Sequence, residues 1–113
     1  MNLSLSETND ITIIKLDGSI LGGPDATALN DTVHNLVEKK VKHFILDLKG
    51  VKTMNSSGLG MLMASHATIR NAGGHLKIAG ASEKIENLFV ITRLSNVFEL
   101  HPTVKKAVES FSK

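Results

Sequence analysis

Apolar and polar residues alternate at the start of the chain. Leu3 and Leu5 are separated by serines, which predicts a half-buried strand because successive side chains of a strand point to opposite faces. The Asn-Asp pair at 9–10 is typical of a turn, and the apolar residues of 11–16 predict a second strand. We expect these two strands to pair antiparallel, because only a short turn connects them.

Four later segments carry apolar residues at helical spacing. Pro24 and Asp25 suit the first turn of the first helix, and the glycines at 73–74 suit the end of the second. Ser82 and Thr103 are good N-caps for the third and fourth helices. The residues on the predicted apolar faces are Ala26, Leu29, Val33, Leu36 and Val37; Leu59, Leu62, Met63, His66 and Ile69; Ile85, Leu88, Phe89 and Thr92; and Val104, Ala107, Val108 and Phe111.

Three further strands are predicted between these helices. Residues 44–48 and 75–79 are apolar runs typical of strands covered on both faces, and residues 97–100 predict a short edge strand. This alternation indicates an α/β fold with a mixed, mostly parallel sheet of four to five strands and about four helices. The length of 113 residues fits one domain over residues 1–113.

The composition argues against several kinds of site. The chain has no cysteine, so it can hold no disulfide, thiolate zinc site or cysteine nucleophile. Its five histidines show no paired metal-ligand spacing, and we expect no metal and no cofactor. A formal net charge of +2 is too small to indicate nucleic-acid binding. The four phenylalanines fall on predicted apolar faces and not on a surface for stacking bases.

The location of the protein is predicted from its apolar segments. The first ten residues have neither the basic region nor the apolar region of a secretory signal. The longest apolar runs are too short to span a bilayer. We therefore expect a cytoplasmic protein without membrane insertion.

Residues 47–60 are the most informative stretch of the chain. They read Asp-Leu-Lys-Gly-Val-Lys-Thr-Met-Asn-Ser-Ser-Gly-Leu-Gly, which predicts the end of a buried strand, a loop over 49–57 and a helix start with two hydroxyls. Functional groups collect at the carboxyl ends of parallel strands, where this loop is expected. Gly58 and Gly60 remove side-chain bulk from the first helical turn, so another backbone or a partner can approach closely.

This stretch resembles the signature of STAS domains, in which a strand ending in Asp-Leu is followed by a short turn and Asp-Ser-Ser/Thr-Gly-Leu-Gly. The best-known members are bacterial anti-sigma-factor antagonists. In them the serine after the aspartate is phosphorylated by a partner kinase that is also the anti-sigma factor. The resemblance covers essentially the whole chain and implies a single STAS-like domain with Ser56 as phosphoacceptor and Ser57 as a mainly structural neighbour.

The resemblance also implies partners and a binding surface. The expected partner is an anti-sigma factor with serine kinase activity, and a phosphatase is a further expected partner. The oligomeric state is left open. The implied partner-binding residues are Ser19, Ile20, Leu21, Asn55, Ser56, Ser57, Gly58, Leu59, Gly60 and Met61.

Two positions depart from the family pattern. Asn55 replaces the usual aspartate, and the loop that often reads Gly-x-Leu-Asp is Gly-Ser-Ile-Leu at 18–21. Both changes remove an acid from surfaces that the family uses for its partner. Asn55 in place of aspartate favours a second interpretation, in which the chain is a non-phosphorylated STAS scaffold subunit of a transporter or of a stress-signalling assembly.

The serines and glycines of residues 56–60 also allow other interpretations. Ser56 and Ser57 are also ordinary N-cap residues for the second helix. The glycines do not form a nucleotide-binding motif, because Met63 stands where a third glycine belongs and no Gly-Lys-Ser/Thr follows. Neither serine lies in a Gly-x-Ser-x-Gly elbow, and no convergent acid, base or metal group is visible. We therefore expect no catalytic residues and no enzyme.

Overall fold

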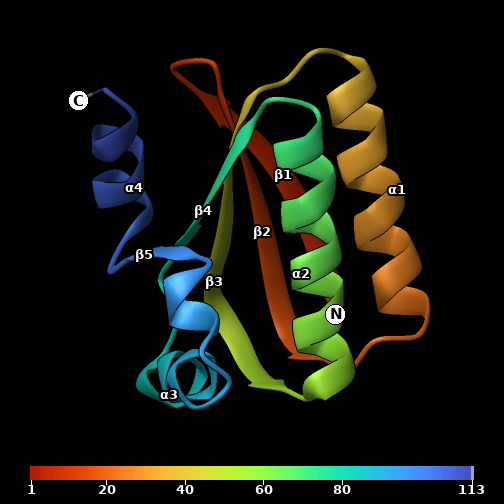
Figure 1. Cartoon of the computed structure of the whole chain (residues 1–113), viewed down its shortest axis with the longest axis vertical. Helices are drawn as coiled ribbons and strands as arrows, with labels where there is room; N and C mark the ends of the chain where they lie inside the picture. Colours follow the sequence, from red (N-terminus) through yellow and green to blue (C-terminus); the bar gives the residue numbers. More distant parts are fainter. Residues whose placement is uncertain (113) are drawn as a thin grey trace.

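A mixed sheet with strand order β1-β2-β3-β4-β5 forms the centre of the computed structural model, which describes residues 1–112 (Figure 1). β1 pairs antiparallel with β2, and all other neighbouring strands pair parallel. This arrangement confirms the predicted α/β fold with a mostly parallel sheet. Lys113 of the predicted domain lies outside the described residues. The strands are β1 Asn2–Thr8, β2 Ile11–Ile20, β3 His43–Met54, β4 His75–Ala79 and β5 Glu99–His101.

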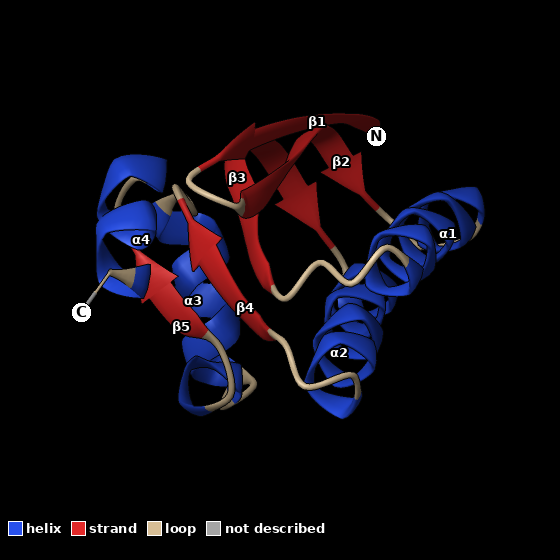
Figure 2. Ribbon diagram, turned by 90° about the horizontal axis from the view of Figure 1, so that it is seen from above, coloured by secondary structure: helices blue, strands red, loops and turns tan. Residues whose placement is uncertain are grey.

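The helices cover the two faces of the sheet unequally. α1, α2 and α3 bury their apolar residues against one face, whereas α4 packs on the other face (Figure 2). No helix within residues 1–112 has both the length and the apolar character needed to cross a membrane. The helices are α1 Pro24–Glu38, α2 Ser56–Asn71, α3 Glu83–Ile91 and α4 Val104–Phe111, with a 3-10 turn, η1, at Leu94–Asn96.

β3 divides the apolar core into two parts. Its side chains alternate, so Phe44 and Leu46 are fully buried beneath the three helices and Ile45 is fully buried on the α4 face. Ile45 packs there in one cluster with Ala79 of β4 and Ala107 of α4. This two-sided burial explains why the β3 segment reads as a continuous apolar run.

The predicted hairpin forms, but its first strand is less buried than expected. Asn9 and Asp10 have φ values of 50° and 64°, as a two-residue hairpin turn requires, and Thr8 faces Ile11. Leu5 is 50% exposed, because β1 is an edge strand. The expectation of a half-buried strand was therefore wrong for this part of β1.

Parts of two predicted loops belong to strands in the structure. β2 continues to Ile20, and Gly18, with a φ of 90°, lies where the register with β3 shifts. β3 continues to Met54, so only Asn55 separates it from α2. Local glycines suggested loops, but both segments are held by long parallel pairing that a local pattern does not reveal.

The end of the chain is joined to the sheet by a small polar cluster. Lys77 of β4 lies 3.0 Å from the Glu99 carboxylate, donates a hydrogen bond to Ser110 at 2.6 Å and lies 4.1 Å from the Phe111 ring centroid. β5 starts later than predicted, at Glu99 and not at residue 97, because the backbone turn at η1 continues to Phe98. The hydrogen bond with His101, supported by Lys77, lowers the pKa of Glu99.

The lowered pKa of Glu99 predicts a pH-dependent contribution to stability. A carboxyl group with a lowered folded-state pKa stabilises the fold above its unfolded pKa of about 4.3, and this contribution is lost as the pH falls through the folded-state value. Glu99→Gln should therefore unfold at a lower urea concentration than the wild type at pH 7. The difference should narrow below about pH 4. A difference of constant size across this pH range would contradict the role of the ionised carboxylate.

Candidate functional site

The start of α2 and the loop between β2 and α1 meet at one end of the sheet. Asn55 is the N-cap of α2, and its Oδ1 accepts a hydrogen bond from Gly58 N–H at 2.8 Å. Its Nδ2 donates to the carbonyl of Leu21 at 3.3 Å, and its backbone N–H donates to Ile20 O at 3.4 Å. Asn55 therefore joins the ends of β2 and β3 to the first turn of α2.

The N-cap function of Asn55 leaves the two serines free. Ser56 and Ser57 are exposed, and neither hydroxyl forms a hydrogen bond within residues 1–112. The interpretation of these serines as N-caps was therefore wrong, because the residue before them has that function. Ser56 presents an unoccupied hydroxyl at the first position of the helix.

Two glycines allow the close contact between the elements of the site. A Cβ at Gly58 would lie 2.2 Å from Ile20 O, and a Cβ at Gly22 would lie 2.7 Å from Ser57 Cβ. Of the two alternatives that the sequence suggested, another backbone or a partner, Gly58 accommodates a backbone, that of the chain's own β2. Gly60 is different, because a Cβ there would meet no atom within 4 Å. Only Gly60 of the two helical glycines is open to a partner.

The structure exposes about half of the predicted partner-binding residues. Leu21, Asn55, Ser56, Ser57 and Gly60 are exposed, and Ser19 is half-buried, where its hydroxyl accepts a hydrogen bond from Thr53 at 3.0 Å. The other four are buried, so they do not contribute to the exposed part of this surface. They are Ile20, Gly58, Leu59 and Met61.

The sequence suggested that Met61 is exposed to a partner and that Met63 is buried, and the structure shows the reverse burial of the two side chains. Met61 is 6% exposed, whereas Met63, predicted to face the core, is 44% exposed. α2 packs against both α1 and the sheet. The buried side of the helix therefore includes Met61, and Met63 lies on the exposed side. Ser56, Gly60 and Met63 follow one another at i, i+4 and i+7 and share one exposed side of the helix.

We call the exposed residues at this end of the molecule the Ser56 surface. It contains the free hydroxyls of Ser56 and Ser57 and two exposed apolar side chains, Leu21 and Met63. The first turn of α2 carries no acidic residue, and the helix start provides a partial positive charge. The surface therefore combines apolar contact area with a position that accommodates a negative charge. Its members are Leu21, Asn55, Ser56, Ser57, Gly60 and Met63.

No group of three or more His, Asp or Glu side chains that could hold a metal ion occurs within residues 1–112. Asp47, considered from sequence as a residue that could orient the Ser56 loop, instead accepts a hydrogen bond from Lys49 N–H at 3.0 Å. It lies on the side of the sheet that α4 partly covers. The Ser56 surface is held by Asn55 without help from Asp47.

The domain family of the chain is shown by comparison with known proteins. Residues 2–107 match the sequence model of the STAS domain, so the chain belongs to the STAS domain family. It is 30% identical to an anti-sigma-B factor antagonist of Listeria monocytogenes over 88% of this chain and 90% of the relative. It is 36% identical to the anti-sigma-B factor antagonist of Bacillus subtilis, over about half of each chain (47% and 49%).

Solved structures of the same fold have lower sequence identity. A putative anti-sigma factor antagonist from Thermotoga maritima superposes with a TM-score of 0.89 at 20% identity, over 98% of this chain and 95% of that one. The Bacillus cell fate determinant SpoIIAA in its phosphorylated form gives 0.75 at 15% identity, over 97% and 99%. A sulfate transporter family protein from Wolinella succinogenes gives 0.81 at 17% identity, over 91% and 85%. These likenesses confirm the fold.

The two glycines of α2 give opposite predictions for stability. Gly58→Ala should lower the free energy of unfolding by about 2–3 kcal/mol, because the backbone of β2 has to move away from the new Cβ. Gly60→Ala should raise it by roughly 0.5–1 kcal/mol, because alanine favours the helix and meets no atom. Urea unfolding of both variants measures the difference. Equal effects of the two substitutions would contradict the close contact at Gly58.

The two hydrogen bonds of the Asn55 side chain can be separated by substitution. Asn55→Ala removes both and should cost about 1 kcal/mol, a typical value for the loss of an N-cap. Asn55→Asp keeps the acceptor, adds a charge that the helix start favours and loses the donor to Leu21, so it should remain within about 0.5 kcal/mol of the wild type. Amide exchange at residues 21–23 should nevertheless increase in Asn55→Asp. Unchanged exchange in this loop would show that the donor is unimportant.

Proposed function

We propose that this chain is an anti-sigma-factor antagonist that works as a phosphorylation-controlled switch. It binds an anti-sigma factor with serine kinase activity through the Ser56 surface, and phosphorylation of Ser56 releases the partner. The observation that carries this proposal is the exposed Ser56 hydroxyl, free of hydrogen bonds because Asn55 caps the helix. A phosphatase resets the switch, which we place in the cytoplasm.

The site tolerates a phosphate within its own fold. Phosphorylation adds about −1.5 to −2 charges and three strong acceptors. Ser56 is exposed, the first turn of α2 has no acidic residue, and free N–H groups at a helix start favour an anion. The added group therefore displaces no buried contact, and the domain stays folded.

A bound partner is affected much more strongly than the fold. A partner that covers Ser56 together with Leu21 and Met63 removes this end of α2 from water. A phosphate dianion buried in that contact carries a large desolvation cost unless the partner supplies matching cations. One modification can thus leave the fold intact and abolish binding.

The relatives support this proposal by their names and their fold. The Listeria and Bacillus subtilis relatives are both called anti-sigma-B factor antagonists. SpoIIAA in its phosphorylated form shares the fold of this chain, which supports the argument that the fold accommodates such a group.

A second candidate function follows from Asn55. Its amide gives the loop a hydrogen bond that a carboxylate cannot donate, so the residue is explained by structure without a kinase. The chain would then be a non-phosphorylated scaffold subunit of a transporter or of a stress-signalling assembly. The fold shared with a sulfate transporter family protein is consistent with this alternative.

Serine variants inside and outside the Ser56 surface distinguish these functions. Ser56→Asp should lose the partner, whereas Ser56→Ala should retain most of the binding. The matched control is Ser6→Asp, at an exposed serine of β1 outside the Ser56 surface, and it should also retain the binding. The measurement is capture from the native lysate, identification of the captured protein by mass spectrometry, and incubation of the complex with ATP. The wild type should gain one phosphoryl group at Ser56 and Ser56→Ala none.

Two results would contradict the switch. A partner held equally by wild type, Ser56→Ala and Ser56→Asp would favour the scaffold. A large loss of thermal stability in Ser56→Asp would show that the charge disturbs the fold and not only the contact. Urea unfolding of each variant separates the two effects.

A further inference from the structure

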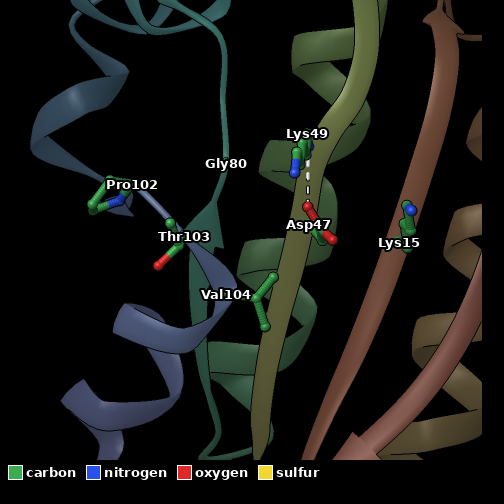
Figure 3. Close-up of a pocket in the computed structure, with 7 residues that line it drawn as sticks. All are labelled: Lys15, Asp47, Lys49, Gly80, Pro102, Thr103 and Val104. Atoms are coloured by element: carbon green, nitrogen blue, oxygen red, sulfur yellow. Dashed lines mark hydrogen bonds between the residues drawn. The ribbon is translucent and has the colours of Figure 1, made fainter.

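A second candidate site lies on the other side of the sheet from α1 and α2. A cavity of about 530 Å³ opens between the start of α4 and the exposed part of β2 and β3 (Figure 3). Its volume is in the range of small-molecule sites. Seven residues line it: Lys15, Asp47, Lys49, Gly80, Pro102, Thr103 and Val104.

The charges around this cavity favour an anion. Lys15 and Lys49 are exposed, and neither forms an ion pair within the part of the chain that the structure describes. Asp47 is the cross-strand neighbour of Lys15, and its Oδ1 is already engaged by Lys49 N–H (Figure 3). Two ammonium groups and one carboxylate leave an excess positive charge, and the nearby start of α4 adds to it.

The cavity has a fixed wall and an apolar side. Gly80 has a φ of +72°, and a Cβ there would lie 3.1 Å from Lys49 Cβ and 3.3 Å from Asp47 Oδ1. The backbone at this position is therefore closely packed against β3. Pro102 and Val104 provide an apolar surface across from the lysines, at the start of α4 (Figure 3).

We propose that this cavity binds a small organic phosphate. Its phosphate group lies between the ammonium groups of Lys15 and Lys49, and its organic part lies against Pro102 and Val104. The cavity is larger than a bare phosphate ion needs, and its lining is partly apolar, so an organic ester fits it better than inorganic phosphate. The free Oδ2 of Asp47 accepts a hydrogen bond from a hydroxyl of such a ligand.

The test uses phenyl phosphate as the probe with the full, ¹⁵N-labelled chain. Saturable amide shifts are expected at Lys49, Gly80 and Val104. Lys15→Gln and Lys49→Gln should each weaken binding by about tenfold, as expected for loss of one charge-assisted hydrogen bond. Lys52→Gln is the matched control, because Lys52 is an exposed lysine of β3 outside the cavity, and it should leave the affinity unchanged.

Each arm of the experiment has a decisive outcome. Phenol should not bind, and inorganic phosphate should bind more weakly than phenyl phosphate. Shifts that do not saturate, or equal weakening by Lys52→Gln, would show diffuse attraction to surface charge and overturn the site. Inorganic phosphate binding as tightly as phenyl phosphate would overturn the assignment of an organic ligand. Binding should be the same in Ser56→Asp, so this test stands apart from the proposed switch.

Discussion

The site depends on one close contact, in which the first turn of α2 lies directly on the end of β2. The carbonyl of Ile20 is so near to Gly58 that no larger residue fits, and the same carbonyl accepts the backbone hydrogen bond from Asn55. This contact fixes the position of α2 along the sheet. This contact also determines the position of Ser56, which is the first residue of α2, and the path of the loop at residues 21–23, which continues from the end of β2.

The sequence predicted those features that short segments determine. The turn at Asn9, the buried run of β3 and the side-chain caps at Ser82 and Thr103 are all present. Each of them depends on residues only a few positions apart. The strand extensions through Gly18 and Gly50 were missed, because they depend on pairing between distant segments. A glycine in a paired strand has the same local signature as a glycine in a loop.

Within the site, sequence reasoning identified the right helix start but misassigned several of its side chains. Asn55 was predicted as a partner-binding residue and noted as a departure from a family pattern, but not as the N-cap, although asparagine is among the best N-cap residues. The predicted burial of Met61 and Met63 was the reverse of what the structure shows. Which side of α2 is buried depends on how α1 packs against this helix. Spacing alone gives the period of a helix, and the neighbouring elements decide which side faces inward.

Asn55 is also compatible with the phosphorylation that we propose for Ser56. An aspartate would accept the hydrogen bond from Gly58, but it could not donate to Leu21. It would also place a negative charge beside a phosphorylated Ser56, and two like unit charges about 6 Å apart near a protein surface repel by roughly 1–3 kcal/mol. Asparagine avoids this repulsion and keeps the loop attached. Compared with aspartate, Asn55 therefore lowers the cost of the proposed phosphorylated state within the chain, while it removes a charge that a partner could otherwise recognise.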